Sequence, residues 1–132
     1  MDFFLEMEPP TVTAQMRRVT VKNGKPMFYK SQRLKEARSL FIWSLMPYRP
    51  EQPLDGAIRL HVTWMFPTKS HKTGEWRITR PDTDNLQKLL KDCMTEVGFW
   101  NDDAQVCVEC IGKMWTRENP GIQIKVERIA EK

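Results

Sequence analysis

Apolar residues occupy every second position between Ile58 and Phe66, and most of the residues between them are polar, His61 among them. This period of two predicts a strand with one buried face and places His61 on its polar side. A different pattern follows at residues 84–97, where apolar residues recur at spacings of three and four and Gly98 supplies a stop. We predict that this second segment is the best-defined helix of the chain.

Weaker patterns complete the predicted set of elements. Asn23-Gly24 is the short-range signal for a hairpin turn, and three prolines with one glycine mark residues 47–56 as a linking loop. Residues 67–80 are predicted to form a long basic loop. The remaining segments are predicted as strands at 3–7, 17–21, 26–29, 104–115 and 122–126, and as a helix that begins after Ser31 and ends at Pro47.

Length and composition predict a single globular domain over residues 1–132, with 40% hydrophobic residues spread in short segments. No apolar stretch reaches membrane-spanning length and no signal peptide is recognisable, so we expect a cytoplasmic protein without a membrane partner. The three cysteines are expected to be reduced thiols. Cys107 and Cys110 have CxxC spacing, but neither His61 nor His71 stands at metal-ligand spacing from them, which favours ordinary thiols over a zinc or redox site.

Charged residues are distributed unevenly along the chain. The net charge is +4 and the pI is near 9.1, yet residues 82–103 contain six carboxylates and only two lysines. Asp82 and Asp84 are two residues apart, and Lys88 follows one helical turn later on the same face. Asp102 and Asp103 come from the turn after the helix, and we expect the following strand to return them to the first two acids.

Carboxylates and a lysine without a serine, histidine or cysteine relay suit metal-assisted phosphodiester hydrolysis. The acids would hold one or two Mg²⁺ ions, for which Mn²⁺ is a possible substitute, and Lys88 would offset negative charge at the phosphate. Each residue also has a structural reading. Asp84 could be only an N-cap, Asp82 a solvated loop acid, Lys88 a helical ion-pair partner, and Asp102 with Asp103 turn formers.

The acids lie in two linked motifs, Asp82-Thr83-Asp84-Asn85-Leu86-Gln87-Lys88 and Gly98-Phe99-Trp100-Asn101-Asp102-Asp103-Ala104-Gln105-Val106. Together they resemble the signature of the RusA family of Holliday-junction resolvases, small dimeric endonucleases of phages and bacteria. The resemblance implies that Asp82, Asp84 and Asp103 are metal-binding catalytic acids, that Lys88 is the catalytic lysine, and that Asp102 is only a neighbour. It also implies a symmetric homodimer and an α/β (α+β) fold, a mixed sheet packed by two main helices.

The sequence departs from the family pattern at two places. Pro81 stands where a basic residue is expected before the first aspartate, with Arg80 one position earlier, and the loop at 67–80 is longer than the usual link. Basic residues are concentrated in this loop and between Arg17 and Arg38, where eight stand against one acid. Phe28, Tyr29 and Trp76 could stack on or wedge between unpaired bases at a branch point, although aromatic residues more often belong to a core or a dimer interface. The predicted DNA contacts are Arg17, Arg18, Lys22, Lys30, Lys69, Lys72, Arg77 and Arg80.

The sequence therefore predicts a Mg²⁺-dependent, structure-selective endonuclease that resolves four-way DNA junctions by paired nicks and works as a homodimer. Two alternatives stay open. The same chemistry could act on other branched DNA, such as flaps or forks, or the protein could be a non-catalytic DNA-binding accessory.

Overall fold

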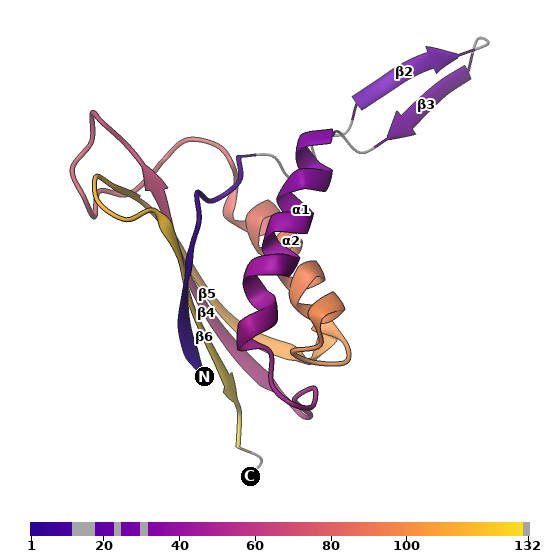
Figure 1. The fold of residues 1–132 in the computed structure, drawn as a ribbon, viewed down its shortest axis with the longest axis vertical. Coiled ribbons are helices and arrows are strands. Elements are labelled where there is room, and N and C mark those ends of the chain that lie inside the picture. The colour runs from indigo at the N-terminus through magenta and orange to yellow at the C-terminus, as the bar shows by residue number, and fades with distance from the viewer. Residues whose placement is uncertain (12–17, 23–24, 30–31, 131–132) are drawn as a thin grey trace.

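The computed structural model describes residues 1–11, 18–22, 25–29 and 32–130, and for 18–22 and 25–29 it describes the backbone alone. Two helices cover one face of a four-stranded sheet, and a two-stranded hairpin projects beyond the start of the first helix (Figure 1). The elements in chain order are β1 (Asp2–Glu6), β2 (Arg18–Lys22), β3 (Lys25–Tyr29), α1 (Gln32–Leu45), η1 (Met46–Tyr48), β4 (Ile58–Pro67), α2 (Thr83–Val97), η2 (Asp103–Gln105), β5 (Val106–Thr116) and β6 (Gly121–Arg128).

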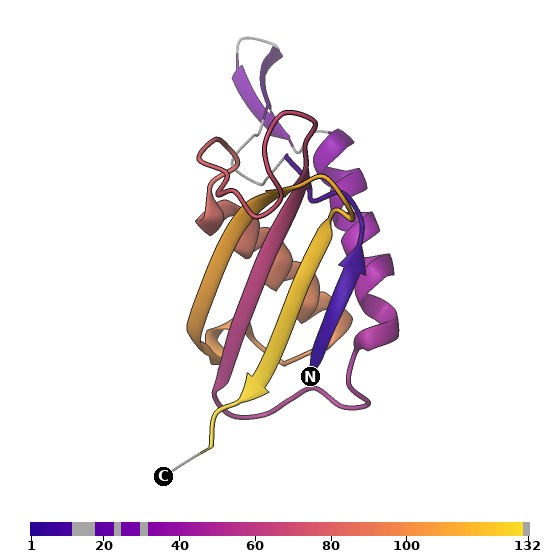
Figure 2. The ribbon, with the colours of Figure 1, turned by 90° about the vertical axis from the view of Figure 1, so that its left-hand side faces the viewer.

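The sheet is mixed, as predicted for an α/β (α+β) fold. Its strand order is β1-β6-β4-β5, with β4 and β5 parallel and the other neighbours antiparallel. Figure 2 views the face of the sheet that the helices do not cover. A parallel pair of strands needs a crossover connection. The chain therefore leaves the end of β4, runs back along α2 and enters the neighbouring strand β5 at the opposite end of the sheet.

The core lies between the covered face of the sheet and the two helices. The apolar positions of β4 are buried throughout, and α2 buries the stripe predicted from its spacing. Removing one such side chain from water stabilises the fold by about 1.5–3 kcal/mol. Gly98 ends α2 in the left-handed region at φ 103°, and its N–H donates to the Met94 and Thr95 carbonyls, which confirms the predicted stop. Midway along α2, an ion pair between Lys91 and Glu109 joins the helix to β5.

Three smaller predictions have plain outcomes. His61 is exposed on the open face of β4, as its polar position implied. Cys107 and Cys110 lie exposed on β5, whereas Cys93 is buried in α2. Ser31, the predicted N-cap of α1, lies outside the described residues. Within the described ranges, no helix combines the length and hydropathy that crossing a bilayer requires.

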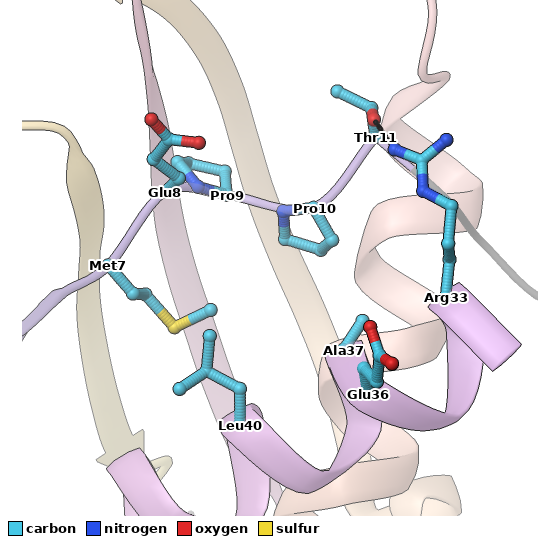
Figure 3. Close-up of a pocket in the computed structure, with 9 residues that line it drawn as sticks. All are labelled: Met7, Glu8, Pro9, Pro10, Thr11, Arg33, Glu36, Ala37 and Leu40. Carbon is cyan, nitrogen blue, oxygen red and sulfur yellow. Dashed lines mark hydrogen bonds between the residues drawn. The ribbon is translucent and has the colours of Figure 1, made fainter.

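A hollow of about 370 Å³ lies where the chain leaves β1 and passes over the first half of α1 (Figure 3). Pro9 and Pro10 form one side, and Leu40 and Arg33 of α1 form the other, with Arg33 donating a long hydrogen bond to the Thr11 hydroxyl at 3.5 Å. None of the predicted catalytic residues lines this hollow. The site must therefore be sought at the start of α2.

Candidate metal site and nucleic-acid surface

Asp82 and Asp84 stand at the N-terminal end of α2. Asp82 is the N-cap residue, with extended backbone at φ −74° and ψ 147°, but its carboxylate makes no capping hydrogen bond. Asp84 lies in the first turn, and its Oδ1 accepts a hydrogen bond from the Asn85 N–H at 2.9 Å. Both side chains are exposed. The helix thus begins without using the Asp82 carboxylate, which stays available to a ligand.

Lys88 is placed as the spacing predicted. α2 is continuous over Thr83–Val97, so Lys88 lies one turn beyond Asp84 on the same helical face, and its side chain is exposed. The helix start adds N–H groups that lack intrahelical partners and the positive end of the helix dipole. The acid pair and Lys88 therefore lie beside a region that favours a bound anion such as phosphate.

Asp103 lies at the other end of α2. The helix spans 15 residues, from the residue after Asp82 to the residue before Gly98, which at 1.5 Å per residue is about 22 Å. Among the residues that the structure describes, no group of three acidic, histidine or cysteine side chains is close enough to hold one metal ion. The expectation that the strand after the turn returns Asp103 to Asp82 and Asp84 is therefore wrong for a single chain.

The neighbour of Asp103 has a local structural role. The Asp102 carboxylate accepts from the Ala104 N–H at 2.9 Å and caps the short helix η2. The Gln105 side-chain oxygen accepts from the Asn101 and Asp102 N–H groups at 3.0 and 3.1 Å. Its amide nitrogen also donates to carbonyls of the 54–56 loop. These bonds fix the turn and leave the half-buried Asp103 beside the start of β5.

The residue that β5 does carry back to the acids is Lys113. Its ammonium donates to the carbonyls of Thr79 at 2.5 Å and Pro81 at 2.6 Å. Burial lowers the pKa of Lys113, Arg77 lowers it further by repulsion, and the nearby carboxylate of Asp82 opposes both. Sequence reasoning missed this residue, because its partners are backbone carbonyls and carry no side-chain signature.

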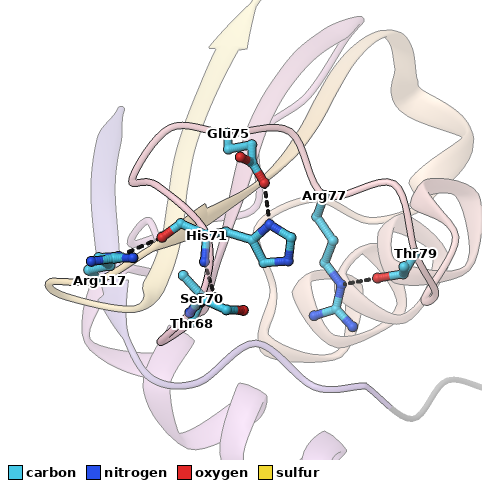
Figure 4. A network of polar contacts seen from close by, with 7 residues as sticks. All are labelled: Thr68, Ser70, His71, Glu75, Arg77, Thr79 and Arg117. Atoms are coloured by element: carbon cyan, nitrogen blue, oxygen red, sulfur yellow. Dashed lines mark hydrogen bonds and ion pairs between the residues drawn. The ribbon is translucent and has the colours of Figure 1, made fainter.

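Arg77 completes the support of the segment before the acids. Its guanidinium donates to the Arg80 carbonyl at 2.5 Å and to the Thr79 hydroxyl at 3.2 Å (Figure 4). It also lies over the rings of Phe66 and Trp115, at 4.3 and 4.5 Å from their centroids. Burial lowers the pKa of Arg77. Two cations thus bind three successive carbonyls, those of residues 79–81, immediately before Asp82.

Replacing Lys113 with methionine should disturb the acid pair without removing it. Because two charge-assisted hydrogen bonds to the segment before Asp82 are lost, we expect the Mg²⁺ concentration for half-maximal DNA cleavage to rise about tenfold, while the rate at saturating Mg²⁺ stays within about threefold. Lys113→Arg should restore most of the metal affinity. The control is Lys125→Met on β6, whose lysine pairs with Glu127. An unchanged metal requirement in Lys113→Met would contradict this positioning role.

The predicted DNA contacts fall into two groups in the structure. Arg17 and Lys30 lie outside the described residues, and Arg18 and Lys22 mark the ends of β2, where only the backbone is described. In the loop after β4, three basic side chains are exposed: Lys69, Lys72 and Arg80. Arg77 is half-buried, and its contacts favour support of the loop over contact with DNA.

The loop after β4 is folded rather than extended into solvent. The His71 ring stacks on Trp115 with centroids 4.7 Å apart and pairs with the carboxylate of Glu75 (Figure 4). Arg117 donates to the His71 carbonyl at 2.6 Å. Residues 74–77 exchange backbone hydrogen bonds with the free edge of β5. The part of this loop at residues 74–77 is therefore held against β5, on the path that leads to Asp82.

Comparison with known proteins agrees with these motifs. The sequence profile of a family described as Endodeoxyribonuclease RusA matches residues 9–127. The chain is 30% identical to a crossover junction endodeoxyribonuclease of Lactococcus phage r1t, over 97% of this chain and 98% of the phage protein. Shorter matches, 54% identical over 35 residues, cover 26% of this chain and 29% of proteins of the same name from Escherichia coli K12 and Enterobacteria phage 82. Because the profile spans most of the chain, the protein belongs to the RusA endodeoxyribonuclease family.

Proposed function

We propose that this protein is an endonuclease that cuts Holliday junctions with a divalent metal ion, preferably Mg²⁺, held by Asp82, Asp84 and Asp103. Its family and its full-length phage relative support junction cleavage. The observation that carries the site assignment is the Asp82 carboxylate, which stands at the N-cap of α2 without capping it. A stabilising cap would use that oxygen, and a ligand site leaves it open.

The donors fit Mg²⁺ by their chemistry. Mg²⁺ prefers hard oxygen ligands and is usually bound by one or two carboxylates together with water and substrate phosphates. Asp82 and Asp84 supply two exposed carboxylates within one turn. When bound there, Mg²⁺ supplies Lewis-acid chemistry at the scissile phosphate. Asp82 and Asp84 would hold it, and the carbonyl contacts of Lys113 and Arg77 would keep the two carboxylates in place.

Lys88 has a separate role in this proposal. Its ammonium lies one turn beyond Asp84, on the side where a phosphate bound at the acids would extend along the helix. There it would offset the negative charge that develops on the phosphate oxygens in the transition state. The free N–H groups at the start of α2 favour the same anion.

In this proposal, Asp103 contributes to the metal site of a second copy of the chain. Within one chain, Asp82 and Asp103 lie beyond opposite ends of α2, which is about 22 Å long. In a two-fold dimer whose copies of α2 run in opposite directions, Asp103 of the partner subunit would reach the acid pair, and each dimer would have two composite sites. Two sites related by a two-fold axis suit paired nicks across a four-way junction, which is itself roughly two-fold symmetric.

The test is cleavage of labelled four-way junction, flap, fork and linear duplex of matched sequence, with Mg²⁺, with Mn²⁺ and with EDTA. We expect cutting of the four-way junction at least about tenfold faster than of the duplex, at paired positions in opposite strands, and none with EDTA. Faster cutting of flaps or forks would instead support the second substrate class. Junction binding without cutting in either metal would support a DNA-binding accessory, and equal cutting of linear duplex would overturn junction selectivity.

A further inference from the structure

The loop that leads to Asp82 presents two large apolar side chains to solvent. Trp76 is 64% exposed and Ile78 is 92% exposed. Between them, Arg77 points inward and lies over the rings of Phe66 and Trp115. The alternation is that of an extended segment with one side packed on the protein and the other open. Two large apolar side chains exposed next to one another on the same side of a segment form a patch of the kind that marks interaction sites.

Trp76 is held rigidly although it is exposed. On one side of it, the Glu75 carbonyl accepts from the Trp115 N–H at 2.9 Å, and on the other the Arg77 N–H donates to the Lys113 carbonyl at 3.1 Å. The indole lies against Gly112 of β5, where a Cβ atom would meet its Cζ3 at 3.5 Å. The indole ring therefore packs against β5 at this position. A preorganised aromatic ring loses little conformational entropy when a ligand stacks on its free side.

A pocket of about 330 Å³ adjoins the indole on the open face of the sheet. Its wall includes His61 and Thr63 of β4 and Met114 of β5, which offer a ring nitrogen, a hydroxyl and a thioether. This volume is at the small end of the range for ligand sites, about 300–1,000 Å³. The pocket therefore suits one planar group with polar edges and is too small for a peptide or a helix.

The surroundings favour DNA as the source of that group. The same loop carries the exposed cations Lys69, Lys72 and Arg80, which attract phosphate, and no exposed carboxylate of the loop other than Glu75 offsets them. Lys113 lines this pocket and also donates to the carbonyl of Pro81, one residue before Asp82, so the pocket and the proposed active site share a bordering residue. A base in a continuous duplex is stacked on both sides, whereas a base at a branch point can leave the stack at lower cost.

We propose that Trp76 and this pocket hold a single nucleobase that leaves the stack at the branch point, beside the phosphate to be cut. The base stacks on the free face of the indole, and its polar edge faces His61 and Thr63. Ile78 extends the apolar surface toward the neighbouring base. This site rests on the proposed function, which supplies the branched DNA.

A coupling experiment between protein and DNA tests this site. Binding is measured in the Asp82→Asn background, which prevents cutting, to junctions in which each branch nucleotide in turn is replaced by an abasic site. At one position, we expect Trp76→Ala and the abasic change each to weaken binding about tenfold, and the two together to weaken it no further. Trp76→Phe should keep most of the affinity, because it retains a stacking ring.

The matched control is Trp43→Ala, which removes a tryptophan that is 79% exposed on α1, far along the chain from the loop. It should bind every junction like the parent protein. Wild-type affinity of Trp76→Ala, or losses that add at every branch position, would overturn the base site. The same series on single-stranded DNA separates the two proposals. If Trp76→Ala and the abasic change are still coupled on single-stranded DNA, and the protein binds junctions no more tightly than single strands, the junction function would be overturned. The base site would then still be supported.

Discussion

Replacing Asp82 with asparagine should reduce junction cleavage by about a thousandfold or more, while junction binding stays within about threefold of wild type. The amide keeps the shape of the side chain but removes the charge that a divalent cation needs, and a loss of about 4 kcal/mol of transition-state stabilisation corresponds to this factor. Because the carboxylate makes no capping hydrogen bond, the free energy of unfolding should change by less than about 0.5 kcal/mol. The measurement is single-turnover cleavage beside thermal unfolding.

Asp92→Asn is the matched control for this experiment. Asp92 belongs to the same acidic segment and lies on α2, but it stands eight residues beyond Asp84, more than two turns away. Its substitution should leave cleavage within about twofold of wild type. If Asp82→Asn cut the junction as fast as Asp92→Asn does, the assignment of Asp82 as a metal ligand would be wrong.

Mixing two inactive variants should restore activity if the site is shared between subunits. In a heterodimer of Asp82→Asn and Asp103→Asn, one composite site carries both substitutions and the other carries neither. An equal mixture forms heterodimers in about half of its dimers when subunits exchange freely. We therefore expect the mixture to recover about a quarter of the wild-type number of intact sites, and to give single nicks rather than paired ones. The measurement compares nicked with fully resolved junction.

The control mixture combines Asp82→Asn with Asp84→Asn. These residues belong to the same half of the composite site, so every site in every dimer keeps one substitution and the mixture should stay inactive. Recovery in this control would point to contaminating wild-type protein rather than to shared sites. If the first mixture recovered no cleavage activity although subunit exchange had been shown independently, the composite site would be ruled out. Asp103 would then have no role at the metal.

Local patterns in the sequence were sufficient for the elements and for the relative placement of Asp84 and Lys88 on α2. The alternation in β4 and the apolar stripe of α2 arise from periods of two and 3.6 residues, which any strand or helix with one buried face must follow. The same helical geometry placed Lys88 one turn beyond Asp84, because residues four apart on a helix share a face whatever the rest of the fold does. The mixed α/β fold with two helices was implied by the family resemblance, and the structure confirms it.

The contacts between distant segments were decided by the tertiary structure alone. Asp103 is linked to Asp82 in the family motif, but a rigid helix of 15 residues keeps the two ends apart within one chain. Lys113 came to the acids instead, because the parallel crossover returns the far half of β5 to the start of α2. Arg77, predicted to contact DNA, lies instead over two aromatic rings. Charge and spacing in the sequence identify candidate side chains for a site. The directions of the helices and strands that connect these side chains determine which of them come close together.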